Sequence, residues 1–311
     1  MHAVMYNYDI ETTSGHTALR KEETKMKKVT SLILVLALLV CGAFTLSSCN
    51  SSGADEKIYV QTNAFFAPFE YYDGTEIVGV DVEIMELVGE KLGKEIVWTH
   101  GEFGIIIDLV SQGVSADCGA AGITVTDERA AKVDFSNTYF TSIQYVVLDK
   151  NTAIETKTDA NGNEYVVWES LAGMSIATQT DTTGWIYADC EIDCEGGVLY
   201  GTEGTEHTAM DSANVAADAL GTTIDALIVD ELPAQYLTNN NDSFKCYPLY
   251  YSGAEGEEDS AVIEEYAIAV TKGNTELLNA INEVLATLLV KDENGETAID
   301  KMVMAHMGMA D

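Results

Sequence analysis

The sequence predicts an α/β protein that is divided into two units of ordinary domain size. Its 311 residues, 47% of them hydrophobic, are enough to bury a substantial core. Segments with apolar residues at every second position alternate with segments whose apolar residues recur three or four apart, which is typical of strands alternating with helices. The polar run "TAIETKTDANGNEY" at 152–165 interrupts this alternation and predicts a domain boundary near residue 150.

The first unit begins with the strand-like segment "KIYVQT" (57–62), in which Ile58 and Val60 share one face. A helix is expected next, because apolar residues recur at helical spacing before Gly93, a residue type that commonly ends helices. Those apolar residues are Ile84, Leu87, Val88 and Leu92. Another strand ("VWTHGEF"), a helix ("GIIIDLVSQG") and a short buried strand ("ADCGAAG") follow.

The second unit starts with a strand in "LAGMSIATQ" and continues with a helix in "SANVAADALG". The strand "IDALIVD" and a helix in "ELPAQYL" come next, before the charged, glycine-containing run "SGAEGEEDS". The pattern then predicts a strand at "YAIAVT" and a closing amphipathic helix. The apolar stripe of that helix consists of Leu278, Ile281, Leu285, Leu288 and Leu289.

The charge balance excludes some partners. The chain has 51 Asp and Glu against 16 Lys and Arg, a formal net charge of −35. Nucleic acids and anionic lipid surfaces both require a basic footprint. We therefore expect no nucleic-acid partner and no docking on a lipid surface through the folded body.

The segment from Met26, "MKKVTSLILVLALLVCGAFTLSSC", has the order of a secretory signal: two lysines, an apolar run and small residues. Its last four residues, 46–49, resemble a bacterial lipobox, which implies cleavage before Cys49 and a lipid on its sulfur. A membrane-spanning helix is the alternative. We expect a mis-called start over 1–25, a lipoprotein signal peptide over 26–48 and a polar tether over 49–57. The mature protein is then lipid-anchored to the outer face of the cell membrane and contacts that membrane only through the anchor.

Four cysteines remain after the signal and the lipidated residue: Cys118, Cys190, Cys194 and Cys246. Neither a Cys-x-x-Cys pair nor a histidine at zinc spacing accompanies "DCEIDCEGG". We expect unpaired thiols, with one disulfide or a metal site as the alternatives. No metal and no cofactor are predicted.

Five segments in order resemble the polar amino-acid-binding proteins of bacterial ABC importers, solute-binding protein family 3. They are "FFAPFEYYDGTEIVGVDVEI", "AAGITVTDERAAKVDFSNTYF", "QTDTTG", "IDALIVDELPA" and "YAIAVTKGN". The resemblance implies a two-lobed periplasmic-binding-protein-like (type II) fold with a hinge of two crossing strands and a ligand held between the lobes. Lobe 1 is then 58–145 with 267–311, and lobe 2, with the hinge strands, is 146–266.

The resemblance places Arg129, the single arginine after residue 48, at the position that binds the ligand carboxylate. Guanidinium suits this role, because its planar fork meets a carboxylate with two hydrogen bonds. Thr124, Thr182 and Thr183 complete the carboxylate site. The alternatives are a surface arginine paired with an adjacent acid, and threonines that cap a helix. The chain departs from the family at Asp181, where glycine is usual.

For the ligand ammonium, the resemblance implies the Asp230 carboxylate, the Gly122 carbonyl and the Thr124 hydroxyl. Asp230 as the cap of the following helix is the alternative. The side-chain pocket is expected to be walled by Asn63, Phe66 and Phe103. Asn63 stands where relatives that select cationic side chains often have an acid, and its neutrality argues against an exclusively basic ligand.

The resemblance implies the substrate-binding component of an ABC importer, which captures an amino acid between its lobes and delivers it to the permease subunits. We expect no enzyme activity, since no nucleophile–base pair or metal cluster is visible in the sequence. An enzyme on the same fold, such as a dehydratase, and a sensory ligand-binding domain are the alternatives, because fold alone does not assign function.

Overall fold

The computed structural model describes residues 56–309. The expectations for the start at 1–25, the signal peptide at 26–48 and the lipidation of Cys49 lie outside these residues. Within 56–309 no helix combines the length and the apolar character needed to cross a membrane.

The first sheet has five strands in the order β5–β1–β6–β17–β7. β1 is parallel to β5 and β6, and β17 is antiparallel to β6 and β7. We call the part of the chain built on this sheet lobe 1. Its strands are β1 (Lys57–Thr62), β5 (Glu95–His100), β6 (Cys118–Gly119), β7 (Asp134–Phe135) and β17 (Ala269–Val270). A small three-stranded sheet adds β2 (Phe65–Phe66), β3 (Glu70–Asp73) and β4 (Glu76–Val78).

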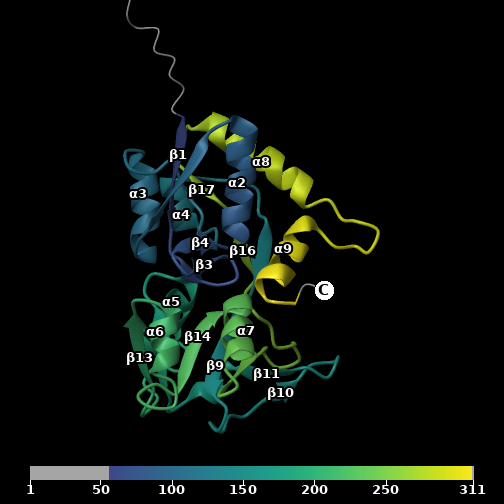
Figure 1. Cartoon of the computed structure of the whole chain (residues 1–311). Coiled ribbons are helices and arrows are strands. Elements are labelled where there is room, and N and C mark those ends of the chain that lie inside the picture. Colours follow the sequence, from purple (N-terminus) through teal and green to yellow (C-terminus); the bar gives the residue numbers. More distant parts are fainter. Residues whose placement is uncertain (1–55, 310–311) are drawn as a thin grey trace, which may run out of the picture. The chain divides into compact units, whose positions relative to one another are not determined.

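The helices of lobe 1 bury mainly apolar residues, except for α4, which buries only Arg129. They are α2 (Val80–Leu92), α3 (Ile106–Gln112) with the short turn η1 (Phe103–Ile105) before it, α4 (Asp127–Lys132), α8 (Thr275–Leu288) and α9 (Ala298–His306). α2 and α8 contact each other and lie side by side in Figure 1. α2 confirms the predicted helix, and Gly93 ends it in the left-handed conformation, φ 67°. Leu87, expected in the apolar stripe, is instead exposed, because the stripe runs through the buried Ile84 and Val88.

The second sheet has seven strands in the order β10–β11–β15–β9–β14–β12–β13, and the part built on it is lobe 2. The strands are β9 (Gln144–Asp149), β10 (Lys157–Thr158), β11 (Glu164–Val167), β12 (Ser175–Gln179), β13 (Glu206–Met210), β14 (Ala226–Asp230) and β15 (Phe244–Tyr250). Its helical segments are η2 (Trp168–Leu171), α5 (Thr183–Ala188), the π-helical η3 (Asp189–Asp193), α6 (Ala213–Asp218) and α7 (Glu231–Asn240). The expected strands "ALIVD" and "SIATQ" are thus β14 and β12, hydrogen-bonded in parallel.

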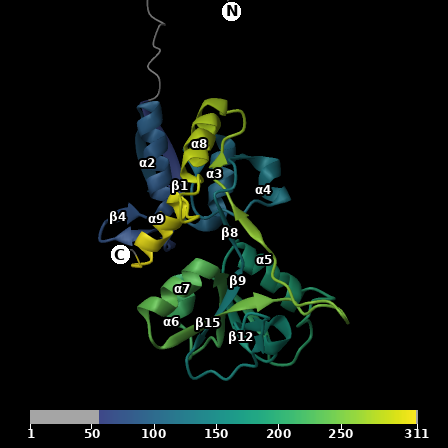
Figure 2. The same ribbon diagram turned by 90° about the vertical axis from the view of Figure 1, so that its right-hand side faces the viewer.

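Two short strands, β8 (Phe140–Ser142) and β16 (Glu264–Tyr266), join the lobes. They pair antiparallel, with Phe140 opposite Tyr266 and Ser142 opposite Glu264. Figure 2 shows β8 between the helices of lobe 1 and the strands of lobe 2. β8 runs almost directly into β9, which begins at Gln144, so the boundary that the sequence places at 145/146 falls within a lobe 2 strand.

The C-terminal part departs from the pattern in two places. The expected single strand "YAIAVT" is divided between β16 and β17, because its first residue pairs with the hinge strand β8 and its later residues join the lobe 1 sheet. The last helix, α9, was not predicted. It begins with a capping box in which Thr297 and Asp300 exchange hydrogen bonds. The four cysteines at 118, 190, 194 and 246 are free thiols.

The stripe of α8 gives a test of the packing. Ile281 is completely buried in the core that α8 shares with α2. We expect Ile281→Ala to lower the free energy of unfolding by about 2–5 kcal/mol, because it removes buried methyl groups and leaves a cavity. Urea titration followed by circular dichroism measures this. Val290→Ala, at a side chain that is 67% exposed just beyond the helix, should change stability by less than about 0.5 kcal/mol. Equal losses would contradict the placement of α8.

Candidate functional site

Arg129 lies in the first turn of α4, only 9% exposed. The side chain of Thr126 caps this helix and accepts a hydrogen bond from the Arg129 amide at 3.2 Å, which fixes where the arginine emerges. The guanidinium carbon stands 5.2 Å from the centre of the Phe103 ring, a cation–π contact. Burial lowers the pKa of the guanidinium, although arginine titrates so high that the group stays charged. The side chain turns inward rather than forming an exposed ion pair.

Two backbone carbonyls hold the guanidinium. Nη1 donates to the Thr124 carbonyl at 2.8 Å, and Nη2 donates to the Asp181 carbonyl at 3.0 Å. Thr124 belongs to lobe 1 and Asp181 to lobe 2, so the guanidinium contacts both lobes. These bonds use two of the five N–H donors of an arginine. Three donors are left to meet an anion.

The loop that contains Gly122 approaches Phe66 closely. Gly122 has φ 51°, and a Cβ there would stand 2.5 Å from the Phe66 ring, so only glycine fits. The Gly122 amide donates to Asp81 at 2.9 Å, and the Tyr139 hydroxyl donates to the same carboxylate at 2.6 Å. Burial raises the pKa of Asp81 to about 6, against the opposing effect of these hydrogen bonds. The buried carboxylate of Asp81 therefore fixes the position of the loop that contains Gly122.

The "DTTG" turn of lobe 2 faces this loop. Asp181 has φ 61°, in the left-handed region, which aspartate tolerates better than most residues. Thr182 is the N-cap of α5: its hydroxyl accepts from the Trp185 amide at 3.2 Å and donates to the Gln179 carbonyl at 2.7 Å. The capping alternative thus holds for the Thr182 side chain. The Thr183 hydroxyl points elsewhere and donates to Glu264 at 2.8 Å.

Asp230 ends β14 and is buried. It occupies the N-cap position of α7, yet its side chain forms no capping hydrogen bond. Instead the carboxylate accepts from Gln144 Nε2 at 2.6 Å and from the Tyr266 hydroxyl. The pKa of Asp230 is raised, mainly by burial and next by the charge of Glu264. The hydrogen bonds from Tyr266 and Gln144 and the charge of Arg129 oppose this rise.

Sequence reasoning missed three polar residues of this site: Gln144, Gln179 and Glu264. Gln144 Nε2 also donates to Glu264, at 2.9 Å, so one amide bridges two buried carboxylates. The period of two in β16 could have indicated Glu264, because it shares a face with the apolar Tyr266 while Glu265 faces solvent. No local signal marks the two glutamines, whose places depend on how the lobes meet.

The predicted residues surround one cavity. Asn63 closes it at one end, donating to the Gly101 carbonyl at 2.7 Å and accepting from Gln179 Nε2 at 3.1 Å. The cavity is lined by Asn63, Phe66, Phe103, Ala121, Gly122, Thr124, Arg129, Gln179, Thr182, Thr183 and Asp230. Its volume is about 20 Å³, enough for a water molecule but not for an amino acid. A larger ligand therefore requires the walls contributed by the two lobes to move apart.

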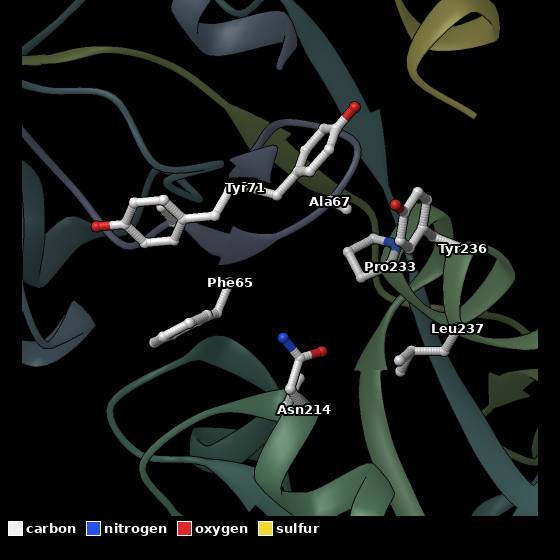
Figure 3. A pocket seen from close by; sticks show the side chains of 10 residues that line it. Phe65, Ala67, Tyr71, Asn214, Pro233, Tyr236 and Leu237 are labelled. Atoms are coloured by element: carbon white, nitrogen blue, oxygen red, sulfur yellow. The ribbon is translucent and has the colours of Figure 1, made fainter. Parts of the chain in front are cut away.

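A larger cavity, about 300 Å³, lies on the other side of β2. Figure 3 shows Phe65, Tyr71, Pro233 and Asn214 around it. Adjacent strand residues point to opposite faces, and accordingly Phe65 lines this cavity while Phe66 lines the small one. No Asp, Glu, Lys or Arg lines the larger cavity, so it offers no partner to a charged ligand. The small cavity, which is lined by both the buried Arg129 and the buried Asp230, is the candidate site.

Among residues 56–309, no group of three or more His, Cys, Asp or Glu side chains is arranged to hold a metal ion. The cavity lining instead joins one cation, one anion and several neutral hydrogen-bonding groups from both lobes. Two α/β lobes joined by a pair of hinge strands, with such a site where they meet, define a two-lobed ligand-binding protein.

The comparisons with known proteins name the family. Residues 58–298 match the model of the bacterial extracellular solute-binding proteins, family 3, and the chain belongs to this family. It is 27% identical over 268 residues to the arginine-binding extracellular protein ArtP of Bacillus subtilis, covering 85% of this chain and 93% of that relative. The L-cystine-binding protein TcyJ of Escherichia coli is 26% identical, with 83% and 89% covered. The arginine-bound, truncated ArgBP of T. maritima superposes with a TM-score of 0.60 at 28% identity, over 75% of this chain and 96% of that one.

The close approach at Gly122 can be tested by adding one methyl group. We expect Gly122→Ala to lower the free energy of unfolding by about 2–4 kcal/mol, because it combines backbone strain with overlap against Phe66. Thermal and urea unfolding measure the loss.

The matched control is Gly74→Ala, which has φ 64° and no atom within 4 Å of the added Cβ. It should cost only the backbone strain, about 1–2 kcal/mol. A loss at Gly122 no larger than the loss at Gly74 would show that the Phe66 ring does not press on this loop.

Proposed function

We propose that this protein captures a polar L-amino acid outside the cytoplasm, between its two lobes, and delivers it to the permease subunits of an ABC importer. The observation that carries the proposal is that the buried Arg129 and the buried Asp230 line one cavity. A free amino acid has a carboxylate and an ammonium on the same carbon, and these two side chains are their natural partners. The family and the binding activities of the relatives point the same way.

The proposed roles follow the hydrogen-bonding capacity of each group. Arg129 and the backbone near Thr124 and Thr183 hold the carboxylate, and Thr182 shapes the turn by capping α5. Asp230, the Gly122 carbonyl and the Thr124 hydroxyl hold the ammonium. Because the site contains little water, the contact of the carboxylate with Arg129 and that of the ammonium with Asp230 are both stronger than they would be in water.

The opposite end of the cavity receives the side chain of the ligand. Phe66 and Phe103 supply aromatic faces, while Asn63 and Gln179 supply neutral amides. Amides both donate and accept, so this end suits a polar side chain and does not demand a positive one. The relatives include arginine-, histidine- and cystine-binding proteins, and one similar solved structure is bound to glutamine. The panel of ligands to test is therefore L-arginine, L-histidine, L-cystine and L-glutamine.

An enzyme on the same fold was the main alternative. The relatives reported above are binding proteins, which favours capture over catalysis. The Thr182 hydroxyl adds to this, because it donates to a backbone carbonyl, which cannot act as a general base.

Arg129 tests the proposed function. Titration calorimetry with the panel should show binding to wild-type protein, and Arg129→Lys should weaken the tightest ligand about ten- to a hundredfold. Lysine cannot form the two-donor contact, and a charge-assisted hydrogen bond is worth about 1.5–3 kcal/mol. The decarboxylated amine of the same ligand should bind wild-type protein poorly and lose little more in the variant.

Lys132→Met is the matched control, since Lys132 is a cation on the same helix whose ammonium pairs with Asp108 at the surface, 3.2 Å away. Its affinity should equal that of the wild type. Should the amino acid and the decarboxylated amine lose the same factor in Arg129→Lys, Arg129 does not bind the carboxylate. Binding of none of the panel to wild-type protein would reject the proposed function.

We also propose that the protein is held at the membrane by a lipid on Cys49. The support is the lipobox-like sequence before this residue and the extracellular character of the family. A lipid on one cysteine and a polar tether keep a folded binding protein near its permease.

Cys49→Ala should therefore abolish membrane association of the mature form, which fractionation followed by immunoblotting measures. Cys41→Ala, a change of the same kind inside the signal segment, should leave the association intact. If mature Cys49→Ala protein still sediments with membranes, the anchor is wrong.

A further inference from the structure

Glu264 is a buried acid that the proposed roles do not use. It is 1% exposed and lies on the hinge strand β16. Its Oε2 accepts from the Thr124 hydroxyl at 2.9 Å and from the Thr183 hydroxyl at 2.8 Å. Its Oε1 accepts from Gln144 Nε2 at 2.9 Å. The carboxylate thus receives one hydroxyl from each lobe, although it does not itself line the cavity.

These contacts fix the direction of two hydroxyl groups. A threonine hydroxyl has one hydrogen to donate, and an ionised carboxylate can only accept. When Thr124 and Thr183 both donate to Glu264, each oxygen has only lone pairs left for a ligand. Both threonines line the cavity, so they present acceptors to it.

The third acceptor of this end is Asp230. Gln144 keeps both carboxylates in the accepting role, because its amide nitrogen donates to Asp230 and to Glu264. Among the residues that the structure describes, its buried Oε1 has no hydrogen-bond partner, and it lies beside Gly184, where an added Cβ would stand only 2.8 Å away. The network therefore offers the cavity three side-chain acceptor oxygens beside the Gly122 carbonyl, enough for the three hydrogens of a primary ammonium.

We propose that Glu264 is the positioning residue that makes this end of the cavity specific for a protonated amine, by taking the hydroxyl hydrogens of Thr124 and Thr183. The inference rests on the proposed function and refines it. It adds the Thr183 hydroxyl to the groups that hold the ammonium and leaves the backbone of Thr183 to the carboxylate. A purely structural Glu264 would hold the lobes together equally well for any ligand.

The test compares two probes that differ only at this end. The first probe is the amino acid of the panel that binds wild-type protein most tightly, and the second is the 2-hydroxy acid with the same side chain. A hydroxyl has one hydrogen to donate where the ammonium has three and a charge, so wild-type protein should prefer the amino acid about a hundredfold or more.

Glu264→Gln removes the charge, and its amide nitrogen at the place of Oε2 donates where both threonine hydroxyls now donate, so their hydrogens are freed to turn toward the ligand. Calorimetry should show about a ten- to hundredfold loss for the amino acid and less than about threefold for the 2-hydroxy acid. Glu264→Asp keeps the charge and should restore most of the preference. Glu265→Gln makes the same change at the exposed neighbour and should leave both affinities unchanged.

Equal losses of the two probes in Glu264→Gln, or no loss of either, would overturn the proposal while wild-type binding of the amino acid upholds the proposed function. If Glu264→Gln does not fold, Thr183→Val decides. It removes one acceptor oxygen at nearly constant shape and should weaken the amino acid more than the 2-hydroxy acid, whereas equal weakening rejects the inference. If wild-type protein binds no amino acid of the panel, the proposed function and this inference fall together.

Discussion

The burial of three charged side chains, Arg129, Asp230 and Glu264, is the constraint on which the site depends. An isolated ion in a protein interior is costly unless hydrogen bonds or opposite charges compensate it. The charge of Arg129 is compensated by hydrogen bonds to two backbone carbonyls and by the face of the Phe103 ring. The two acids share one amide and take hydroxyl groups from three other residues. Since these partners come from both lobes and from the hinge, the charges are compensated together only when the lobes meet.

The hinge strand β16 therefore contributes buried side chains to these contacts as well as connecting the two lobes. Its alternation places Glu264 and Tyr266 on one buried face. The Tyr266 ring packs against Phe69, with ring centres 5.1 Å apart, and its hydroxyl reaches Asp230, so one residue joins the core of lobe 1 to an acid of lobe 2. Any change in the angle between the lobes must alter these contacts. A ligand that replaces them with its own charged ends shifts the populations of open and closed forms by its differential affinity.

The sequence was sufficient where local patterns dominate. The strand at 57–62 and the helix that ends at Gly93 follow from periodicity and a stop signal, and the structure confirms both. All nine proposed ligand-contacting residues line one cavity, although their roles stay proposals. The sequence was insufficient where long-range pairing decides: "YAIAVT" divides because two sheets compete for it. Gln144 and Gln179 look like ordinary strand residues until the other lobe is in place.

The strongly acidic composition is compatible with capture of a carboxylate because the two effects act over different distances. A net charge of −35 creates a repulsive field, but at physiological ionic strength charges more than about 8 Å apart through solvent are largely screened. Arg129 acts at contact distance, and burial reduces the screening there. The bond to the Thr124 carbonyl lies within lobe 1 and persists when the lobes separate, so it limits the ordering that the guanidinium needs when an anion arrives. In the proposed role, one guanidinium at contact distance thus outweighs many distant carboxylates on the surface.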